Sequence, residues 1–130
     1  MSIYQKGASF ERELVREFWD RGWIGMRAAG SGGGVSNAIP DVIAIKNNDI
    51  IALQCKTTKS DRLSLKKDIM QLLDFSNISG ARAYLAIKFH RKKPRFFKID
   101  RFIFEDKYTV KVTDTYLTFD ALICEQSLLR

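Results

Sequence analysis

Residues 40–56, with the sequence PDVIAIKNNDIIALQCK, decide the fold that we predict for this chain. They contain two apolar runs rich in isoleucine, residues 41–46 and 50–56, with the polar segment Asn-Asn-Asp between them. Apolar runs that flank a short segment of Asn and Asp are typical of a β-hairpin. We therefore predict two antiparallel strands here and place them in the central sheet of the domain.

The register of this hairpin determines which polar side chains lie together. A loop of two or four residues centred on residues 47–48 places Asp41 opposite Gln54. Lys56 then lies on the same face of the sheet, one diagonal away from Asp41. A loop of three residues would instead place Asp41 opposite Cys55 and separate the group. The three polar side chains form either a functional group or, as ordinary structural residues, strand ends that meet solvent.

The rest of the chain shows alternating helical and strand patterns without a repeat or a long linker. Residues 8–21 have apolar side chains at helical spacing, and Gly22 can end that helix. We further predict a helix at residues 66–79, strands at residues 23–27, 82–89, 95–99 and 108–113, and a short helix after Thr118 as its N-cap. This order predicts a single α/β domain with a mixed central sheet flanked by helices.

Composition excludes several classes of protein. The chain has 130 residues, of which 45% are hydrophobic, so it can bury a core and is not intrinsically disordered. It lacks the run of roughly 18 apolar residues that a membrane span needs, and its N-terminus lacks a signal-peptide core, so we expect a soluble intracellular protein. Two cysteines and one histidine are too few for a structural zinc site.

The net charge of +7 is unevenly distributed along the chain. Residues 1–98 hold 18 basic and 9 acidic side chains, whereas residues 99–130 hold 4 basic and 6 acidic ones. Dense basic clusters are typical of proteins that bind a polyanion, and a solvated surface is the alternative interpretation. The densest clusters are Lys56, Lys59, Arg62, Lys66 and Lys67, and then Lys88, Arg91, Lys92, Lys93, Arg95 and Lys98. The acidic tail is better suited to a protein contact.

Glu11 interrupts the apolar face of the first predicted helix. At about 100° per residue it falls among the apolar side chains, while the other charged residues of the helix lie on the opposite side. A carboxylate on a buried face is costly unless it is paired, hydrogen-bonded or bound to a metal. Glu11 is therefore either a site residue or the partner of a basic side chain on the sheet.

Together, Glu11, Asp41 and Lys56 predict a metal-dependent phosphodiester hydrolase. Carboxylate oxygens are the ligands that Mg²⁺ prefers, and such a site leaves positions for water and a phosphate. A lysine beside them could stabilise the charge that develops on phosphorus or orient the attacking water. The glycine-rich segment at residues 30–34 lacks the GK[ST] ending of a nucleotide-binding P-loop, so binding of ATP phosphates is not supported.

An ordered set of motif residues resembles the archaeal Holliday junction resolvases, which belong to the PD-(D/E)XK nuclease superfamily. The set comprises Lys6, Gly7, Ala8, Glu11, Arg12, Leu14, Arg27, Gly30, Ser31, Pro40, Asp41, Gln54, Cys55, Lys56, Lys59, Asp61, Lys67, Asp68, Phe75 and the strand from Tyr84 to Phe89. The resemblance covers about residues 4–99 and implies a restriction-endonuclease-like core. Residues 100–130 then supply a C-terminal strand and helix, which we expect to form a dimer contact.

The resemblance assigns roles to individual residues. Glu11 and Asp41 match the metal-binding acids of the family, Lys56 matches its catalytic lysine, and Ser31 matches a serine that completes the site. Gln54 stands where the motif usually has glutamate. Its oxygen can still coordinate a metal but brings no charge, so affinity for a second cation should fall.

The resemblance also implies the substrate and the assembly. It implies a homodimeric, Mg²⁺-dependent endonuclease, with Mn²⁺ able to substitute, that cuts four-way DNA junctions symmetrically and acts at the nucleoid in the cytoplasm of an archaeal-type cell. A C2 dimer supplies the two matched sites. The expected DNA-binding residues are Lys6, Arg12, Arg27, Lys59, Arg62, Lys66, Lys67, Arg91, Lys92 and Lys93. The candidates for apolar interface residues are Phe89, Phe96, Phe97, Phe102, Phe104, Phe119, Leu122 and Ile123, some of which must fill the core instead.

Two alternatives remain open at the level of sequence. Gln54 could mark a protein that binds branched DNA without cutting it. The chain could also be a restriction-type nuclease of the same superfamily that acts on linear duplex.

Overall fold

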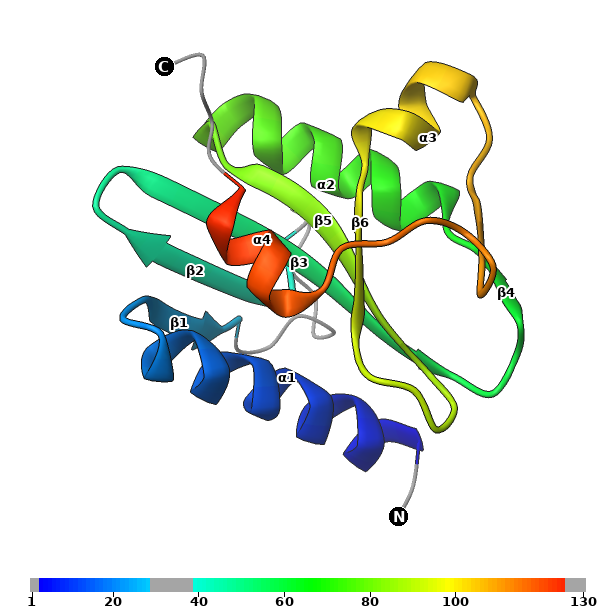
Figure 1. Cartoon of the computed structure of the whole chain (residues 1–130). Helices are drawn as coiled ribbons and strands as arrows, with labels where there is room; N and C mark the ends of the chain where they lie inside the picture. Colours follow the sequence, from blue (N-terminus) through cyan, green and yellow to red (C-terminus); the bar gives the residue numbers. More distant parts are fainter. Residues whose placement is uncertain (1–2, 29–38, 126–130) are drawn as a thin grey trace.

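The computed structural model describes residues 3–28 and 39–125, with side chains from residue 7 onward (Figure 1). Ser31 and the rest of the glycine-rich segment, residues 30–34, lie outside the described residues. The elements, in chain order, are α1 (Ile3–Asp20), β1 (Ile24–Arg27), β2 (Val42–Lys46), β3 (Asp49–Thr58), β4 (Arg62–Ser64), α2 (Lys66–Ser79), β5 (Arg82–Phe89), β6 (Arg95–Lys98), α3 (Asp100–Glu105), β7 (Thr109–Lys111) and α4 (Phe119–Cys124).

Five strands form a mixed central sheet in the order β1-β2-β3-β5-β6. Only β3 and β5 are parallel, and α2 makes the crossover between them, as the connection of parallel strands requires. The other neighbouring strands are antiparallel. Two short strands, β4 and β7, pair separately. The predicted α/β domain with a mixed sheet and flanking helices is therefore confirmed.

Helices cover both faces of the sheet, and each face has its own apolar core (Figure 1). On one face, α1 and α4 pack on the sheet through buried residues such as Phe18 and Leu122. On the other face, α2 and α3 pack through residues such as Ile69 and Phe102. Successive residues of β3 alternate between the two cores, with Ala52 on the α2 face and Leu53 on the α1 face.

The hairpin has the two-residue loop that the preferred register requires. Lys46 pairs with Asp49 and Val42 pairs with Leu53, so the next position would bring Asp41 opposite Gln54. Asn47 adopts a positive φ of 55°, which asparagine tolerates better than most residues. The alternative loop of three residues is excluded.

Gly25 allows α1 to lie close against the edge strand β1. A Cβ atom at this position would lie 2.9 Å from the carbonyl oxygen of Val15 and 3.2 Å from the Cβ of Phe18. Any side chain larger than hydrogen would therefore push the helix away from the strand. Arg27 follows two residues later on β1, so this packing also sets its position relative to α1.

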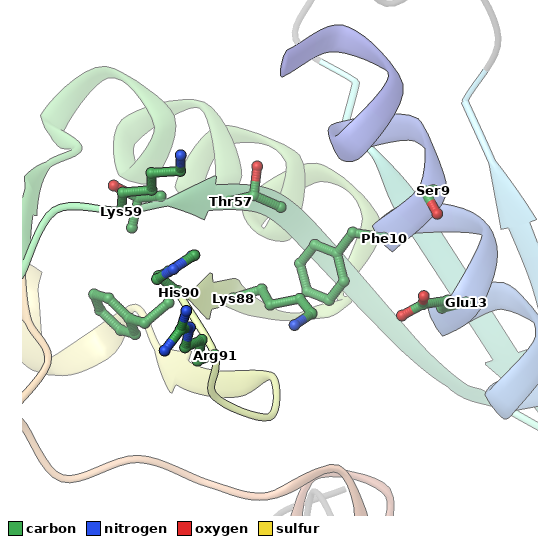
Figure 2. A pocket seen from close by; sticks show the side chains of 10 residues that line it. Ser9, Phe10, Glu13, Thr57, Lys59, Lys88, His90 and Arg91 are labelled. Carbon is green, nitrogen blue, oxygen red and sulfur yellow. The ribbon is translucent and has the colours of Figure 1, made fainter. Parts of the chain in front are cut away.

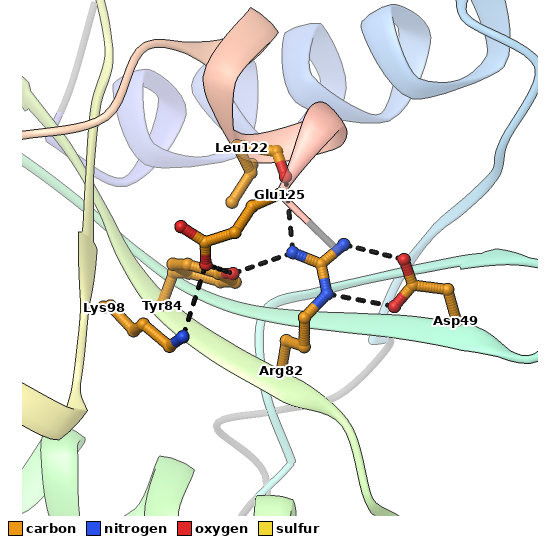
Figure 3. A network of polar contacts seen from close by, with 6 residues as sticks. All are labelled: Asp49, Arg82, Tyr84, Lys98, Leu122 and Glu125. Atoms are coloured by element: carbon orange, nitrogen blue, oxygen red, sulfur yellow. Dashed lines mark hydrogen bonds and ion pairs between the residues drawn. The ribbon is translucent and has the colours of Figure 1, made fainter. Parts of the chain in front are cut away.

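An arginine whose side chain is only 7% exposed, Arg82, attaches the C-terminal segment to the sheet (Figure 3). Arg82 on β5 makes a two-pronged contact with Asp49, with nitrogen to oxygen distances of 3.0 and 2.8 Å. The same guanidinium donates to the hydroxyl of Tyr84 and to the carbonyl of Leu122 in α4. The Tyr84 hydroxyl in turn donates to Glu125 just beyond α4. These contacts fix Leu122 and Glu125, at the end of α4, to β5 of the same domain.

Most predicted elements are confirmed, with differences at short or atypical segments. Helix α1 begins at Ile3 instead of residue 8, because Gly7 weakens the helical pattern without ending the helix. The three-residue strand β4 and the six-residue helix α3 were not predicted. None of the helices within residues 3–28 and 39–125 combines the length and apolar character of a membrane span. Thr118 is confirmed as the N-cap of α4, with its hydroxyl accepting from the Ala121 amide at 3.1 Å.

The structure also separates the core aromatics from the exposed ones. The side chains of Phe89, Phe96, Phe97, Phe102 and Leu122 are buried in the two cores. Phe104 is 92% exposed, while Phe119 and Ile123 are half-buried against the α1 face. Of the predicted interface residues, Phe104 is therefore free for an intermolecular contact.

Candidate active site

Asp41 lies directly before β2 and directly after Pro40, which is buried at the point where the chain enters the sheet. Its Oδ2 atom accepts a hydrogen bond of 2.9 Å from the backbone amide of Cys55 on β3. Burial raises the pKa of Asp41, this hydrogen bond opposes the rise, and the nearby carboxylate of Glu11 adds to it. The carboxylate is thus fixed in place and lies in the negative field of a second one.

Glu11 reaches the same region from α1. Its Oε1 lies 3.1 Å from Nε of Arg27 on β1, and the side chain of Glu11 is 19% exposed. Glu11 therefore does pair with a basic side chain of the sheet, which was one of the two interpretations of its position. The ion pair still leaves Glu11 close enough to act on the pKa values of Asp41 and Cys55. Glu11 thus belongs to the group around Asp41.

Lys56 on β3 points to the face that α2 covers. Its Nζ atom lies 3.5 Å from Oδ1 of Asp68, in the first turn of α2. The charge of Lys56 lowers the pKa of Asp41, and the charge of Asp68 raises it. The sequence did not indicate a role for Asp68 in the site. Asp68 is separated from β3 by the strand β4, so its distance from Lys56 depends on how α2 packs.

Gln54 and Cys55 point to opposite faces of β3. Gln54 is half-buried and lines a small crevice with Pro40, Gln71 and Leu72 on the α2 face. Cys55 packs against the α1 core, where burial, followed by the negative field of Asp41, raises the pKa of its thiol well above the ordinary value. Burial thus favours the protonated thiol at neutral pH.

The chemistry of these side chains fits a hard cation. No three His, Cys, Asp or Glu side chains within the described ranges group closely enough to bind a metal ion on their own. The available donors are the carboxylates of Glu11 and Asp41, and the amide oxygen of Gln54 from the strand position next to Asp41. Oxygen donors of this kind suit Mg²⁺, which usually keeps several water ligands.

The predicted basic residues surround this group from several elements. Lys59, Arg62, Lys66 and Lys67 are exposed at and after the carboxyl end of β3, and Arg91, Lys92 and Lys93 are exposed in the loop between β5 and β6. Arg12 is exposed on α1, and Arg27 is held by Glu11. Lys6 lies on α1, but its side chain is outside the described ones. The structure thus brings together Glu11, Arg27, Asp41 and Lys56, with the other cations further out.

A comparison with family models decides the family. The model of the archaeal Holliday junction resolvase (Hjc) matches residues 2–128. The chain belongs to this resolvase family. The resemblance that the motif residues indicated is thereby confirmed.

Named resolvases from two archaea are similar to the chain in sequence, and the solved structure of one of them is similar in fold. The crossover junction endodeoxyribonuclease Hjc of Methanocaldococcus jannaschii is 41% identical over 88 residues, which cover 67% of this chain and 62% of that protein. The Hjc of Archaeoglobus fulgidus is 42% identical over 96 residues, covering 72% and 69% of the two chains. The solved structure of A. fulgidus Hjc, a Holliday junction resolvase, matches with a TM-score of 0.72 at 33% identity, over 85% of this chain and 93% of that one. The fold is therefore the restriction-endonuclease-like fold of that resolvase, as predicted.

Proposed function

We propose that this protein is a structure-specific endonuclease that resolves four-way DNA junctions by paired, metal-dependent hydrolysis. The observation that carries the proposal is the convergence of Asp41, Glu11 and Lys56 at one end of the β2-β3 hairpin, in a chain that matches the resolvase family over residues 2–128. The matched relatives carry the name crossover junction endodeoxyribonuclease, which supports this substrate class.

Each residue has a distinct role in the proposed reaction. Glu11 and Asp41, with the oxygen of Gln54, would hold Mg²⁺, and Mn²⁺ should substitute for it. The bound ion supplies activation of water and polarisation of a phosphoryl oxygen. Asp41 is kept in position by the Cys55 amide, so its free oxygen can face the ion. Arg27 holds Glu11 on the strand side of α1 before DNA arrives.

Lys56 would stabilise the negative charge that develops on the phosphate during attack by water. Asp68 acts as a positioning residue, because its carboxylate lies 3.5 Å from the lysine Nζ and restricts the side chain. The pair is partly exposed, with 38% of the Lys56 side chain accessible, so the ammonium can move to a phosphate that enters the site. This arrangement supports cleavage instead of binding alone.

The proposal includes a homodimer that acts at the nucleoid, in the cytoplasm of an archaeal-type cell. One domain of this size carries a single group of site residues, whereas clean resolution needs two matched cuts. A C2 dimer supplies both from one chain.

The test is incubation of the wild-type protein with a labelled four-way junction and with a linear duplex of the same sequences, with Mg²⁺, Mn²⁺ or EDTA. We expect paired symmetric nicks in the junction only when a metal is present. An intact junction in Mg²⁺ and Mn²⁺, despite binding, would favour the non-catalytic alternative that Gln54 raises. Equal cutting of the duplex would favour a restriction-type nuclease.

A further inference from the structure

Asp68 in the first turn of α2 lies over the part of β3 that carries two of the candidate site residues. Gln54 and Lys56 are alternate residues of β3, so their side chains share the face that α2 covers. Nζ of Lys56 lies 3.5 Å from Oδ1 of Asp68. Gln54 lines a crevice with Gln71, which lies about one helical turn after Asp68 on α2. One turn of α2 is therefore stacked on Gln54 and Lys56.

The charge of Asp68 is balanced by one lysine. Among the described residues, Lys56 is the cation that forms an ion pair with Asp68. Other lysines close in sequence have different surroundings. Lys59 lines the pocket between α1 and the ends of β3 and β5 (Figure 2), and Nζ of Lys66 lies 5.4 Å from the ring centroid of Tyr108. Neutralisation of Asp68 therefore depends on Lys56.

The fold favours a negative charge at Asp68 even without this lysine. Asp68 is the acidic residue in the first turn of α2, where the positive end of the helix dipole stabilises an anion. The side chain is only 18% exposed, so water screens its charge in part. A carboxylate in such a position is costly when it has no cation as partner.

The proposed reaction removes the partner of Asp68. The ammonium of Lys56 is partly exposed and moves to the phosphate that enters the site. The charge of Asp68 then remains near Asp41, close enough to raise the pKa of that carboxyl group. Gln54, at the strand position next to Asp41, adds no charge of its own. A cation bound at the site would relieve the repulsion between the two carboxylates.

We propose that Asp68 supplies to the metal site the negative charge that Gln54 does not, and that Lys56 neutralises this charge until a phosphate draws the ammonium away. The inference rests on the proposed function, because it concerns the same metal site. Asp68 needs no direct bond to the ion, since Mg²⁺ usually keeps several water ligands, which can donate to a nearby carboxylate. Asp68 thus acts on the metal as well as on the position of Lys56.

The test measures Mn²⁺ binding to the protein without DNA, by calorimetric titration and by the EPR signal of the free ion. The variants are Asp68→Asn, Lys56→Met, the double variant Lys56→Met/Asp68→Asn, and Gln54→Glu/Asp68→Asn. The matched control is Asp74→Asn, the same change at an exposed position of α2, about 9 Å further along the helix. Thermal unfolding in EDTA shows that each variant is folded.

Asp68→Asn should raise the Kd for Mn²⁺ about threefold, and Lys56→Met should lower it about threefold, because each changes one charge near a divalent ion. In the double variant Lys56→Met/Asp68→Asn the two effects should cancel, so that its Kd returns near the wild-type value. Gln54→Glu/Asp68→Asn should bind at least as tightly as the wild type, because the glutamate restores the missing charge. Asp74→Asn should match the wild type.

The double variant distinguishes a role toward the metal from a purely structural one. If Lys56→Met/Asp68→Asn binds Mn²⁺ as tightly as Lys56→Met, then Asp68 acts only by holding the lysine, and the inference is overturned. An unchanged Kd in Asp68→Asn, or an equal loss in Asp74→Asn, would also overturn it.

Failure of the proposed function is distinguishable from failure of this inference, because the titration needs neither DNA nor cleavage. A wild-type protein that binds Mn²⁺ but leaves a four-way junction intact would contradict the nuclease, whereas the variants would still support or overturn the role of Asp68. A wild-type protein that binds no Mn²⁺ would overturn both.

Discussion

Asp41 lies in the candidate site, and its charge lowers the stability of the folded state. Burial raises its pKa, so the folded protein holds the charged carboxylate less favourably than the unfolded chain does. The Cys55 amide offsets only part of this cost. A charge that weakens the fold and is nevertheless held in place is typical of residues kept for their chemistry.

Asp41→Asn should abolish cleavage while leaving the fold as stable as before or more stable. Asparagine keeps an oxygen for the Cys55 amide but removes the buried charge and the metal ligand. We expect cleavage to fall at least 100-fold in Mg²⁺, with Tm in EDTA unchanged or raised, and with junction affinity equal or higher. Residual turnover near the wild-type rate would place the site elsewhere.

Gln54→Glu should change the response to metal more than any other single substitution. A third carboxylate beside Asp41 and Glu11 adds repulsion when no metal is present and an ionic ligand when Mg²⁺ binds. We expect a lower Tm in EDTA, recovery of Tm with Mg²⁺, and a roughly tenfold fall in the Mg²⁺ concentration for half-maximal cleavage, about 1.4 kcal/mol. The control is Gln71→Glu, which puts the same charge on α2 beside Gln54. Equal metal responses in the two variants would remove Gln54 from the metal site.

Sequence and structure agree best for elements whose apolar pattern alone decides them. The hairpin, α2 and β5 could be predicted because their apolar runs are long and are bounded by Asn or Gly. The strand β7 was predicted within residues 108–113, but its partner β4 has only three residues, too few to show a period, and exists because it pairs with β7. Local sequence therefore predicts the central sheet and β7 but not β4 or the six-residue helix α3.

The same distinction holds for the site. Asp41, Gln54 and Lys56 could be grouped from the hairpin register, and Glu11 from its place on an apolar helix face. The partners Arg27 and Asp68 come from β1 and α2, so their distances depend on the packing of separate elements.

Tyr84 fixes the tail to β5 and gives the fold a defined sensitivity to alkali. Burial, and then the hydrogen bond to Glu125, raise its pKa above the ordinary tyrosine value of about 10. A pKa raised by folding means that the unfolded chain loses the proton first, so stability falls as pH rises above about 10. Tyr84→Phe should lower the free energy of unfolding at pH 7 by about 1–3 kcal/mol, because Glu125 and Arg82 lose a partner, and should flatten the alkaline decline.

Urea unfolding from pH 7 to 11 measures this effect. The control is Tyr116→Phe, a tyrosine that is 43% exposed and whose ring packs against the guanidinium of Arg95. An alkaline decline that is as steep in Tyr84→Phe as in the wild type would contradict the assignment.

At the scale of the whole molecule, the charge and the apolar surface are separated. The basic loops lie around the carboxyl ends of β3 and β5, beside Lys56. The two most exposed large apolar side chains among the described residues are Ile78 at the end of α2, 89% exposed, and Phe104 on α3, 92% exposed. Both belong to the helices that cover one face of the sheet, so a partner that covers them leaves the basic loops free for DNA.

If Ile78 and Phe104 contribute to the proposed homodimer, the double variant Ile78→Glu/Phe104→Glu should weaken that dimer without unfolding the domain. Two carboxylates in an apolar contact would lose hydration without gaining a partner. Sedimentation velocity should show a shift toward monomer at micromolar concentration, and junction cleavage should give single nicks in place of paired ones. The control is Ile24→Glu, an apolar residue 46% exposed on the edge strand β1, which should leave both readouts unchanged. A double variant that stays dimeric, or a control that dissociates equally, would move the interface away from α2 and α3.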